Sequence, residues 1–147
     1  MGRIFNVVFN SDIATATTTT GEIYYYDWGQ LPQGEYKVSF SFVSGVATLT
    51  NVYCANLFVD LGQNSCLVSA NGQSLSSGYL GMLRMSGTGT NQYLFSAITD
   101  NPPHYLMNRP SNNRVYIQVL SNLNNQVTAY TPAPGAYTLC LSLELQD

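Results

Sequence analysis

The residues that most often perform catalysis are few in this chain and lie far apart in the sequence. His104 is the only histidine, and it stands in a proline-bounded stretch, NPPHYLMNRP. Nucleophilic catalysis needs a base beside the nucleophile, and no motif pairs His104 with a Ser or Cys. The eight acidic residues are dispersed and form no motif of paired carboxylates for acid–base chemistry. We therefore predict that the protein is not an enzyme.

The three cysteines, Cys54, Cys66 and Cys140, form no pattern that would hold a metal. The sequence has no CxxC and no Cys/His cluster with the spacing of zinc ligands, and it lacks GxGxxG, P-loop and HExxH motifs. We expect neither a metal nor a cofactor. Because three is an odd number, at least one thiol stays unpaired in any disulfide scheme. Buried free thiols are the expectation, with a Cys54–Cys66 bridge as the alternative.

The chain is unusually poor in charge. Charged residues make up 9% of it, against roughly 25% in typical globular proteins, while Ser, Thr, Asn and Gln supply 49 of the 147 residues. Soluble monomers commonly use surface charge to stay apart. This composition favours a subunit covered by its neighbours in an assembly over a neutral, polar monomer. The net charge of −3 argues against nucleic-acid binding, which needs clustered Lys and Arg.

Neither a leader nor a membrane segment is expected. The N-terminal stretch MGRIFNVVFNSD lacks the apolar core of a signal peptide. No run of the sequence approaches the 18 apolar residues of a transmembrane helix.

Alternation of apolar and polar residues dominates the sequence and predicts antiparallel strands with one face in the core. Turn-forming residues separate these stretches at short intervals. A short helical turn is expected only within Ala97–Met107. The predicted strands are 3–9, 13–18, 22–27, 35–43, 46–50, 52–61, 64–69, 78–86, 91–98, 114–120, 125–130 and 136–145, some of which merge.

About eight such strands in residues 1–147 predict one domain, a single jelly-roll β-sandwich. An immunoglobulin-like sandwich is the alternative, weakened because Trp28 precedes the first clear core strand and lies between no suitable cysteines. The Thr-rich segment Ala14–Glu22 predicts an edge strand or linker, or a strand added to a neighbouring subunit. Leu120–Tyr130 predicts a hairpin through Asn124 and Asn125.

One motif occurs twice. LPQGEYKVSFSF (31–42) and APGAYTLCLSLEL (133–145) both read Pro, Gly, one residue, Tyr and then an alternating strand. Pro presets φ and Gly permits the turn, so both copies are interpreted as strand starters. The outward positions of the two strands include Ser39, Ser41, Thr138 and Ser142, none of which carries charge.

The aromatic stretch IYYYDWG (Ile23–Gly29) is the strongest candidate for a contact surface. Three consecutive tyrosines on a strand cannot all face one core, because alternate side chains point to opposite faces. Tyr and Trp combine apolar area with a polar group, which suits interfaces. A core face with one exposed Tyr, a subunit interface and a carbohydrate-stacking platform all remain open. The candidate interface residues here are Tyr24, Tyr25, Tyr26 and Trp28.

Arg109 and Arg114 flank a turn and complete the set of candidate interface residues. A guanidinium can bind carboxylates or backbone carbonyls across an interface. A pair of this kind is also typical of ordinary surface ion pairing.

Three stretches of the sequence carry a resemblance to a known family. PQGEYKVSFSF, NRPSNNRVYIQVL and PGAYTLCLSLEL together resemble the jelly-roll structural proteins of large icosahedral double-stranded DNA viruses, of the algal-virus minor capsid or penton type. The Pro-Gly-x-Tyr element also resembles a strand of the C1q/tumour-necrosis-factor jelly roll, which forms trimers. That second group is mostly secreted, so the lack of a signal peptide favours the virion protein.

The resemblance implies a structural protein of the virion, made in the host cytoplasm. Its partners would be other capsid proteins or copies of itself in a homo-oligomer or larger assembly, joined by polar, charge-poor interfaces. The alternative is a trimeric C1q/TNF-like or fibre-head module that recognises a receptor or glycan.

Overall fold

The structure, a computed structural model, describes residues 2–17, 21–45, 52–63, 66–68, 74–87, 91–123, 126–129 and 136–146. Within these residues the chain is all β, and its helical turns are the 3₁₀ turns η1 (Ser11–Ile13) and η2 (Trp28–Gln30). The strands are β1 (Ile4–Asn10), β2 (Ala16–Thr17), β3 (Glu22–Tyr25), β4 (Tyr36–Ser44), β5 (Val52–Val59), β6 (Cys66–Val68), β7 (Ser74–Ser77), β8 (Tyr79–Ser86), β9 (Tyr93–Ser96), β10 (His104–Leu106), β11 (Arg114–Leu123), β12 (Gln126–Ala129) and β13 (Tyr137–Leu145).

The strands form one continuous antiparallel path, in the order β1-β13-β4-β9-β8-β5-β11-β3-β2. β10 pairs with β4 and β12 with β11, while β6 and β7 form a separate ribbon. Within β8, residues 79–83 pair with β5 and residues 84–86 with β9. This strand therefore joins a first half of the sheet (β1, β13, β4, β9) to a second half (β5, β11, β3, β2).

The pairing is nested along the chain. β5 pairs with β8, β4 with β9, β3 with β11 and β1 with β13, so each pair encloses the one before it in sequence. Two further ladders, β13–β4 and β11–β5, join strands from different nested pairs. The strand order of the sheet thus follows from one long hairpin of nested strand pairs, in which β13 also pairs with β4 and β11 with β5.

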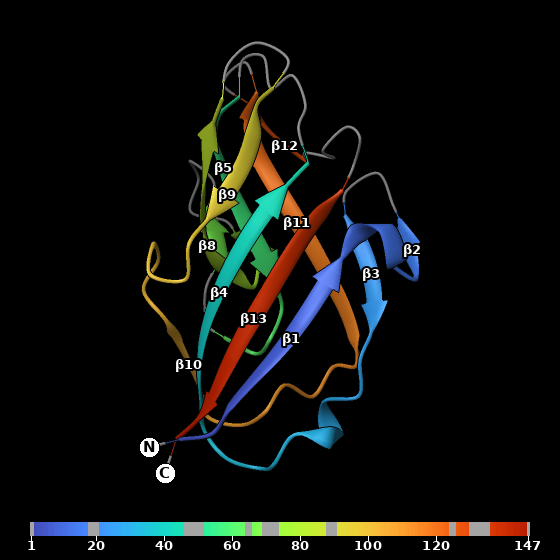
Figure 1. Ribbon diagram of the computed structural model, residues 1–147, viewed down its shortest axis with the longest axis vertical. Helices are drawn as coiled ribbons and strands as arrows, with labels where there is room; N and C mark the ends of the chain where they lie inside the picture. The colour runs from blue at the N-terminus through green and yellow to red at the C-terminus, as the bar shows by residue number, and fades with distance from the viewer. Residues whose placement is uncertain are drawn as a thin grey trace.

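The two halves of the sheet face each other across one core (Figure 1). In β4 and β13 every second side chain is buried, except the partly buried Leu145 at the end of β13, and the alternate ones are at least partly exposed. Contacts cross between the halves: the Phe9 and Tyr24 rings meet edge to face with centroids 5.0 Å apart, and the Tyr24 hydroxyl donates to the Tyr137 hydroxyl at 3.1 Å. The period of two predicted from the sequence is confirmed as the division between core and surface.

The repeated Pro-Gly-x-Tyr motif begins two strands that pair with each other. Tyr36 and Tyr137 are the first residues of β4 and β13, and both are buried. The two strands run antiparallel over nine pairs, from Tyr137 opposite Ser44 to Leu145 opposite Tyr36. The Tyr36 hydroxyl also donates to the Pro32 carbonyl at 2.6 Å, which closes the turn before β4. Both strand starts are confirmed, while Pro134 and Gly135 lie outside the described residues.

β8 approaches its neighbours closely at Gly81, near the irregularity in its pairing with β5. A Cβ at this position would lie 2.6 Å from Cγ of Asn101 and 2.7 Å from Cε1 of Phe40. The Asn101 side-chain amide binds the backbone of β8 as a neighbouring strand would. Its Oδ1 accepts from the Met82 N–H at 2.9 Å, and its Nδ2 donates to the Met82 carbonyl at 3.0 Å. Gly81 lets this side chain bind the backbone of β8.

The sequence placed most strands correctly, but it missed β7 and β10 and misplaced the helical turn. Ala97–Met107 was the expected place for a helical turn, yet it holds a single turn closed by the Asp100 N–H on the Ala97 carbonyl (3.0 Å), followed by β10. The 3₁₀ turns lie elsewhere, each after an Asn or Asp whose side chain accepts an early N–H of the turn. Predicted strand 46–50, Asn124 and Asn125 lie outside the described residues, although β11 and β12 pair as the predicted hairpin requires.

Replacing Gly81 by Ala is expected to lower the free energy of unfolding by about 1–3 kcal/mol, the usual cost of overpacking a filled site. Denaturant unfolding measures this, with the exposed neighbour Met82→Ala as the matched control, expected to change little. An unchanged stability for Gly81→Ala would contradict the close approach of Asn101 and Phe40.

Candidate binding surfaces

The aromatic segment after Ile23 divides between core and surface as alternation requires. Tyr24 is buried, Tyr25 is 63% exposed and Tyr26 is half-buried. Trp28 is only 1% exposed. The outward surface of this segment therefore consists of Tyr25 and part of Tyr26, and the role of these residues in an interface stays a prediction.

Trp28 joins the η2 turn to the segment before β11 through two hydrogen bonds. Its Nε1 donates to the Asn112 carbonyl at 3.0 Å, and its backbone N–H to Asn113 Oδ1 at 3.3 Å. The Tyr26 ring packs edge to face on the indole, with centroids 4.8 Å apart. Because Trp28 is enclosed by these contacts, it acts as an anchor of the core rather than a stacking surface.

The two arginines take different positions. Arg109 Nη1 donates to the carbonyls of Leu31 (2.6 Å) and Gly29 (3.4 Å), so the guanidinium ties the chain after β10 to the η2 turn. Arg114 is exposed, with its guanidinium over the Tyr116 ring at 5.7 Å, and it pairs in register with Tyr25. The fold thus brings Arg114 and Tyr25 together on the surface and leaves Arg109 apart from them.

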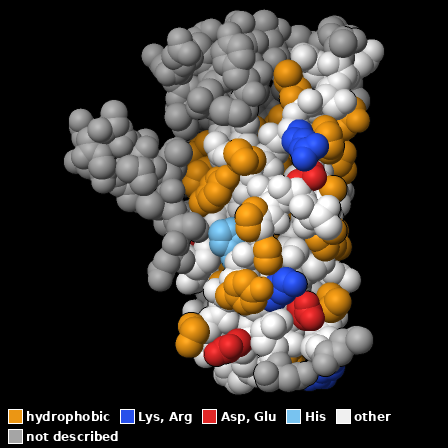
Figure 2. Space-filling model, turned by 90° about the vertical axis from the view of Figure 1, so that its left-hand side faces the viewer, with side chains coloured by type: hydrophobic (Ala, Val, Ile, Leu, Met, Phe, Trp, Pro, Cys, Tyr) orange, Lys and Arg blue, Asp and Glu red, His pale blue; other side chains and the backbone are white. Residues whose placement is uncertain are grey.

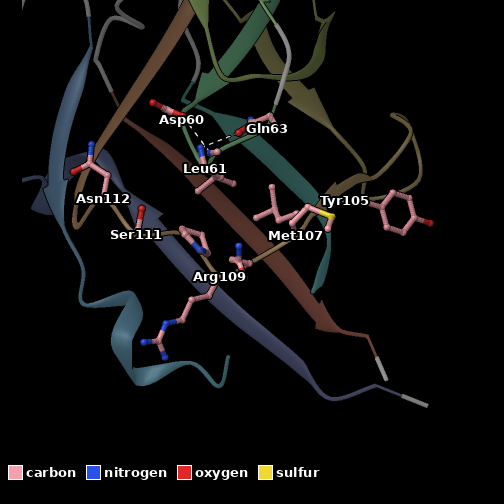
Figure 3. Close-up of a pocket in the computed structure, with 12 residues that line it drawn as sticks. Asp60, Leu61, Gln63, Tyr105, Met107, Arg109, Ser111 and Asn112 are labelled. Atoms are coloured by element: carbon pink, nitrogen blue, oxygen red, sulfur yellow. Dashed lines mark hydrogen bonds between the residues drawn. The ribbon is translucent and has the colours of Figure 1, made fainter. Parts of the chain in front are cut away.

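A pocket of about 520 Å³ opens between the loop after β5 and the segment from Tyr105 to Asn112 (Figure 3). Figure 3 shows Arg109 pointing away from Asp60 and Gln63, toward η2. A smaller pocket of about 350 Å³ lies on the other side of the Asn108–Ser111 segment, against Asp27 and Gln33. The lining of the larger pocket mixes amide, hydroxyl and apolar side chains with one acidic residue, Asp60, and one basic residue, Arg109.

The loop after β5 is a feature of this pocket that sequence reasoning missed. Gln63 accepts the Leu61 N–H through Oε1 at 2.8 Å and donates to the Val59 carbonyl through Nε2 at 2.9 Å. Asp60 Oδ1 accepts the Gly62 N–H at 3.2 Å. Both side chains thus support their own loop, and the Asp-x-Gly-Gln spacing was the only sequence signal for it.

A carboxylate lies buried at the start of β3, beside two tyrosines. Burial raises the pKa of Glu22 above its ordinary value, and a hydrogen bond with Tyr137 opposes this rise. Burial also raises the pKa of Tyr24 to about 12 and that of Tyr137 further. Burial thus favours the neutral form of each of these groups, and the Tyr24–Tyr137 hydrogen bond joins the two halves of the sheet.

His104 and Cys140, which were weighed from the sequence for catalysis and metal binding, both lie in strands. His104 lies in β10, where its Nε2 is 3.0 Å from the Leu80 carbonyl oxygen. Cys140 is a free, half-buried thiol on the outer side of β13, and the side chains of Cys54 and Cys66 lie outside the described part of the chain.

Among the described residues, no three His, Cys, Asp or Glu side chains gather as metal ligands would. Nor does the described part contain a helix long and apolar enough for a membrane crossing.

The face over β8 and β10 carries exposed apolar side chains along its height (Figure 2). One ion pair stands among them, Arg84 with Asp100 at 3.2 Å. Exposed apolar residues that recur on one face are typical of contact surfaces. The exposed large apolar side chains of β8, of β10 and of the segments that flank β10 are Met82, Met85, Ile98, Tyr105 and Met107.

No protein-family model and no curated protein sequence matches this chain.

Replacing Glu22 by Gln is expected to change how stability depends on pH. Because the folded-state pKa of Glu22 is raised above 4.5, its contribution is fully present below that pH and is lost as the pH rises through the folded pKa. Unfolding free energies measured by denaturant from pH 4.5 to about 7 should fall more for the natural chain than for Glu22→Gln. Parallel pH profiles would contradict the buried carboxyl.

Replacing Arg109 by Met is expected to loosen the η2 turn. The Gln30 and Leu31 N–H groups, which bond to the Asp27 and Trp28 carbonyls, should exchange with deuterium roughly tenfold faster, as for a hydrogen bond worth about 1.4 kcal/mol. Arg114→Met, which removes the exposed arginine, serves as the control and should leave these amides unchanged. Equal exchange in both variants would show that Arg109 does not hold the turn.

Proposed function

We propose that this protein is a structural subunit of a virion shell, built as a single jelly roll. The nested pairing supports the jelly roll, because a strip of four nested strand pairs that wraps around a core gives a double-sheet jelly roll. The β13–β4 and β11–β5 ladders are the contacts that such wrapping creates between neighbouring turns of the strip.

The outer face of β4 and β13 carries the proposal. Its partly exposed side chains include Ser39, Ser41, Thr138 and Ser142, as alternation predicted. The Ser142 hydroxyl donates to Asn6 Oδ1 at 2.7 Å, which extends this polar surface onto β1. Burying charges against a neighbour costs several kcal/mol per unpaired ion, so a largely uncharged face is well suited to packing in an assembly.

Within a virion, the subunit would act by geometry. The largely uncharged outer face of β4 and β13 and the apolar face over β8 and β10 would pack against other capsid proteins or copies of the same chain. The minor capsid or penton position follows from the resemblance of the sequence to algal-virus jelly-roll proteins. The protein would then be made in the host cytoplasm and reside in the virion, with no part in catalysis or nucleic-acid binding.

Purified particles test this proposal. Particles from a culture that produces the protein would be banded on a density gradient, washed with salt and detergent, and quantified by mass spectrometry. The chain should co-purify with the major shell protein in a constant ratio across the band. Its loss from washed particles, with the shell protein retained, would contradict a structural place in the virion.

A receptor- or glycan-binding module is the second candidate, favoured by the 520 Å³ pocket beside Gln63. Glycan-array binding would support it if Ser111→Trp, which fills the pocket, abolishes binding while Ser39→Trp on the outer face of β4 does not. Tyr25→Ala tests the aromatic surface in the same assay. Absence of binding to any glycan would remove the glycan version.

A further inference from the structure

β1 forms one edge of the sheet over its whole length. It pairs with β13 at all seven residues, Ile4 through Asn10, without a shift in register. Among the described residues, no strand pairs with its other side. Ile4 and Val8, on the outer face, are 61% and 58% exposed. A regular strand therefore ends the sheet at an accessible edge (Figure 1).

The backbone of β1 directs alternate groups toward this edge. The Leu145 N–H donates to the Arg3 carbonyl at 2.8 Å, so the odd-numbered residues of this ladder turn their backbone groups toward β13. Because antiparallel ladders alternate, the even-numbered residues turn theirs toward the open side. Ile4, Asn6 and Val8 thus present N–H and C=O groups that another strand can bind.

The sequence of β1 lacks the features that usually protect an edge. Natural edge strands are commonly blocked by Lys, Pro, bulges or inward charges. The stretch IFNVVFN contains no charged residue, no Pro and no Gly, and its residues favour extended pairing. This composition suits an edge that pairs with another strand.

Charges stand only at the two ends of β1. Arg3 precedes the strand, Asp12 follows it, and both side chains are exposed. In an antiparallel pair of two β1 strands, Arg3 of each copy comes near Asp12 of the other, so two attractive contacts form at once. A parallel pair would bring like charges together. The charge pattern therefore matches the strand to a second copy of itself.

We propose that β1 pairs antiparallel with β1 of a second copy of this chain about a two-fold axis, which joins the two sheets into one. The register with Val7 on the axis sets Ile4 opposite Asn10 and Asn6 opposite Val8 of the second copy. It uses every outward-directed residue of the strand and brings Arg3 beside the Ser11–Asp12 end. Such an isologous contact closes as a dimer.

This pairing names a partner within the proposed assembly and so rests on the proposed function for its setting. The two ideas fail separately. Loss from purified particles would contradict the virion role, whereas the charge exchange below tests the edge in the isolated chain.

Sedimentation velocity over a wide concentration range tests the pairing. The natural chain should form a dimer, and Arg3→Asp or Asp12→Arg alone should weaken it roughly tenfold at low salt, as repulsion replaces two attractive contacts. The double variant should dimerise like the natural chain, because both attractions return with opposite sign. A mixture of the two single variants should form the heterodimer for the same reason.

Arg114→Asp makes the same charge change on β11, which takes no part in the proposed pairing, and should leave the dimer unchanged. Asn6→Lys adds a charge at the edge and should abolish dimerisation, with its thermal unfolding compared against the natural chain to show that the fold persists. A natural chain that stays monomeric, or single variants whose dimers are unaffected or are not rescued by the double variant, would overturn the proposal.

Discussion

The ladder between β4 and β13 is the contact on which the rest of the structure depends. These strands begin about a hundred residues apart, yet they pair over nine residues, with Tyr36 opposite Leu145 at one end and Ser44 opposite Tyr137 at the other. On one side β13 carries β1, and on the other β4 carries β9. A slip of one residue would turn the buried side chains of a strand to the surface, so burial itself fixes the register.

The same ladder separates two chemical environments. The inner side holds apolar side chains that are almost completely buried, such as Val38, Phe40 and Leu141. The outer side includes the partly exposed hydroxyls of Ser39, Ser41, Thr138 and Ser142. The charged residues of this outer side are Lys37 and Glu144, which lie opposite each other in the register of the ladder. A shell subunit with such faces could pack against neighbours without desolvating many charges, and the edge of β1 would give that packing a direction.

The loops at the η2 end are organised by polar contacts rather than by apolar packing alone. Trp28 binds the Asn112 carbonyl and Arg109 binds the Leu31 carbonyl, so two segments about eighty residues apart become one surface. The two pockets lie on either side of Asn108–Ser111, the segment that the Arg109 contact holds beside η2. Trp28 and Arg109 were predicted as interface residues from the sequence. In the fold their side chains hold these loops together, and neighbouring residues form the exposed surface.

The sequence by itself determined the all-β class, most strand positions and the side of each strand that faces the core. Alternation with a period of two is a local property, and a strand such as β13 expresses it wherever it lies in the fold. Strand order, the open edge at β1, the burial of Trp28 and the strand at His104 were decided only by the tertiary structure. Each depends on contacts between segments distant in sequence, and neither composition nor local spacing records which segments meet.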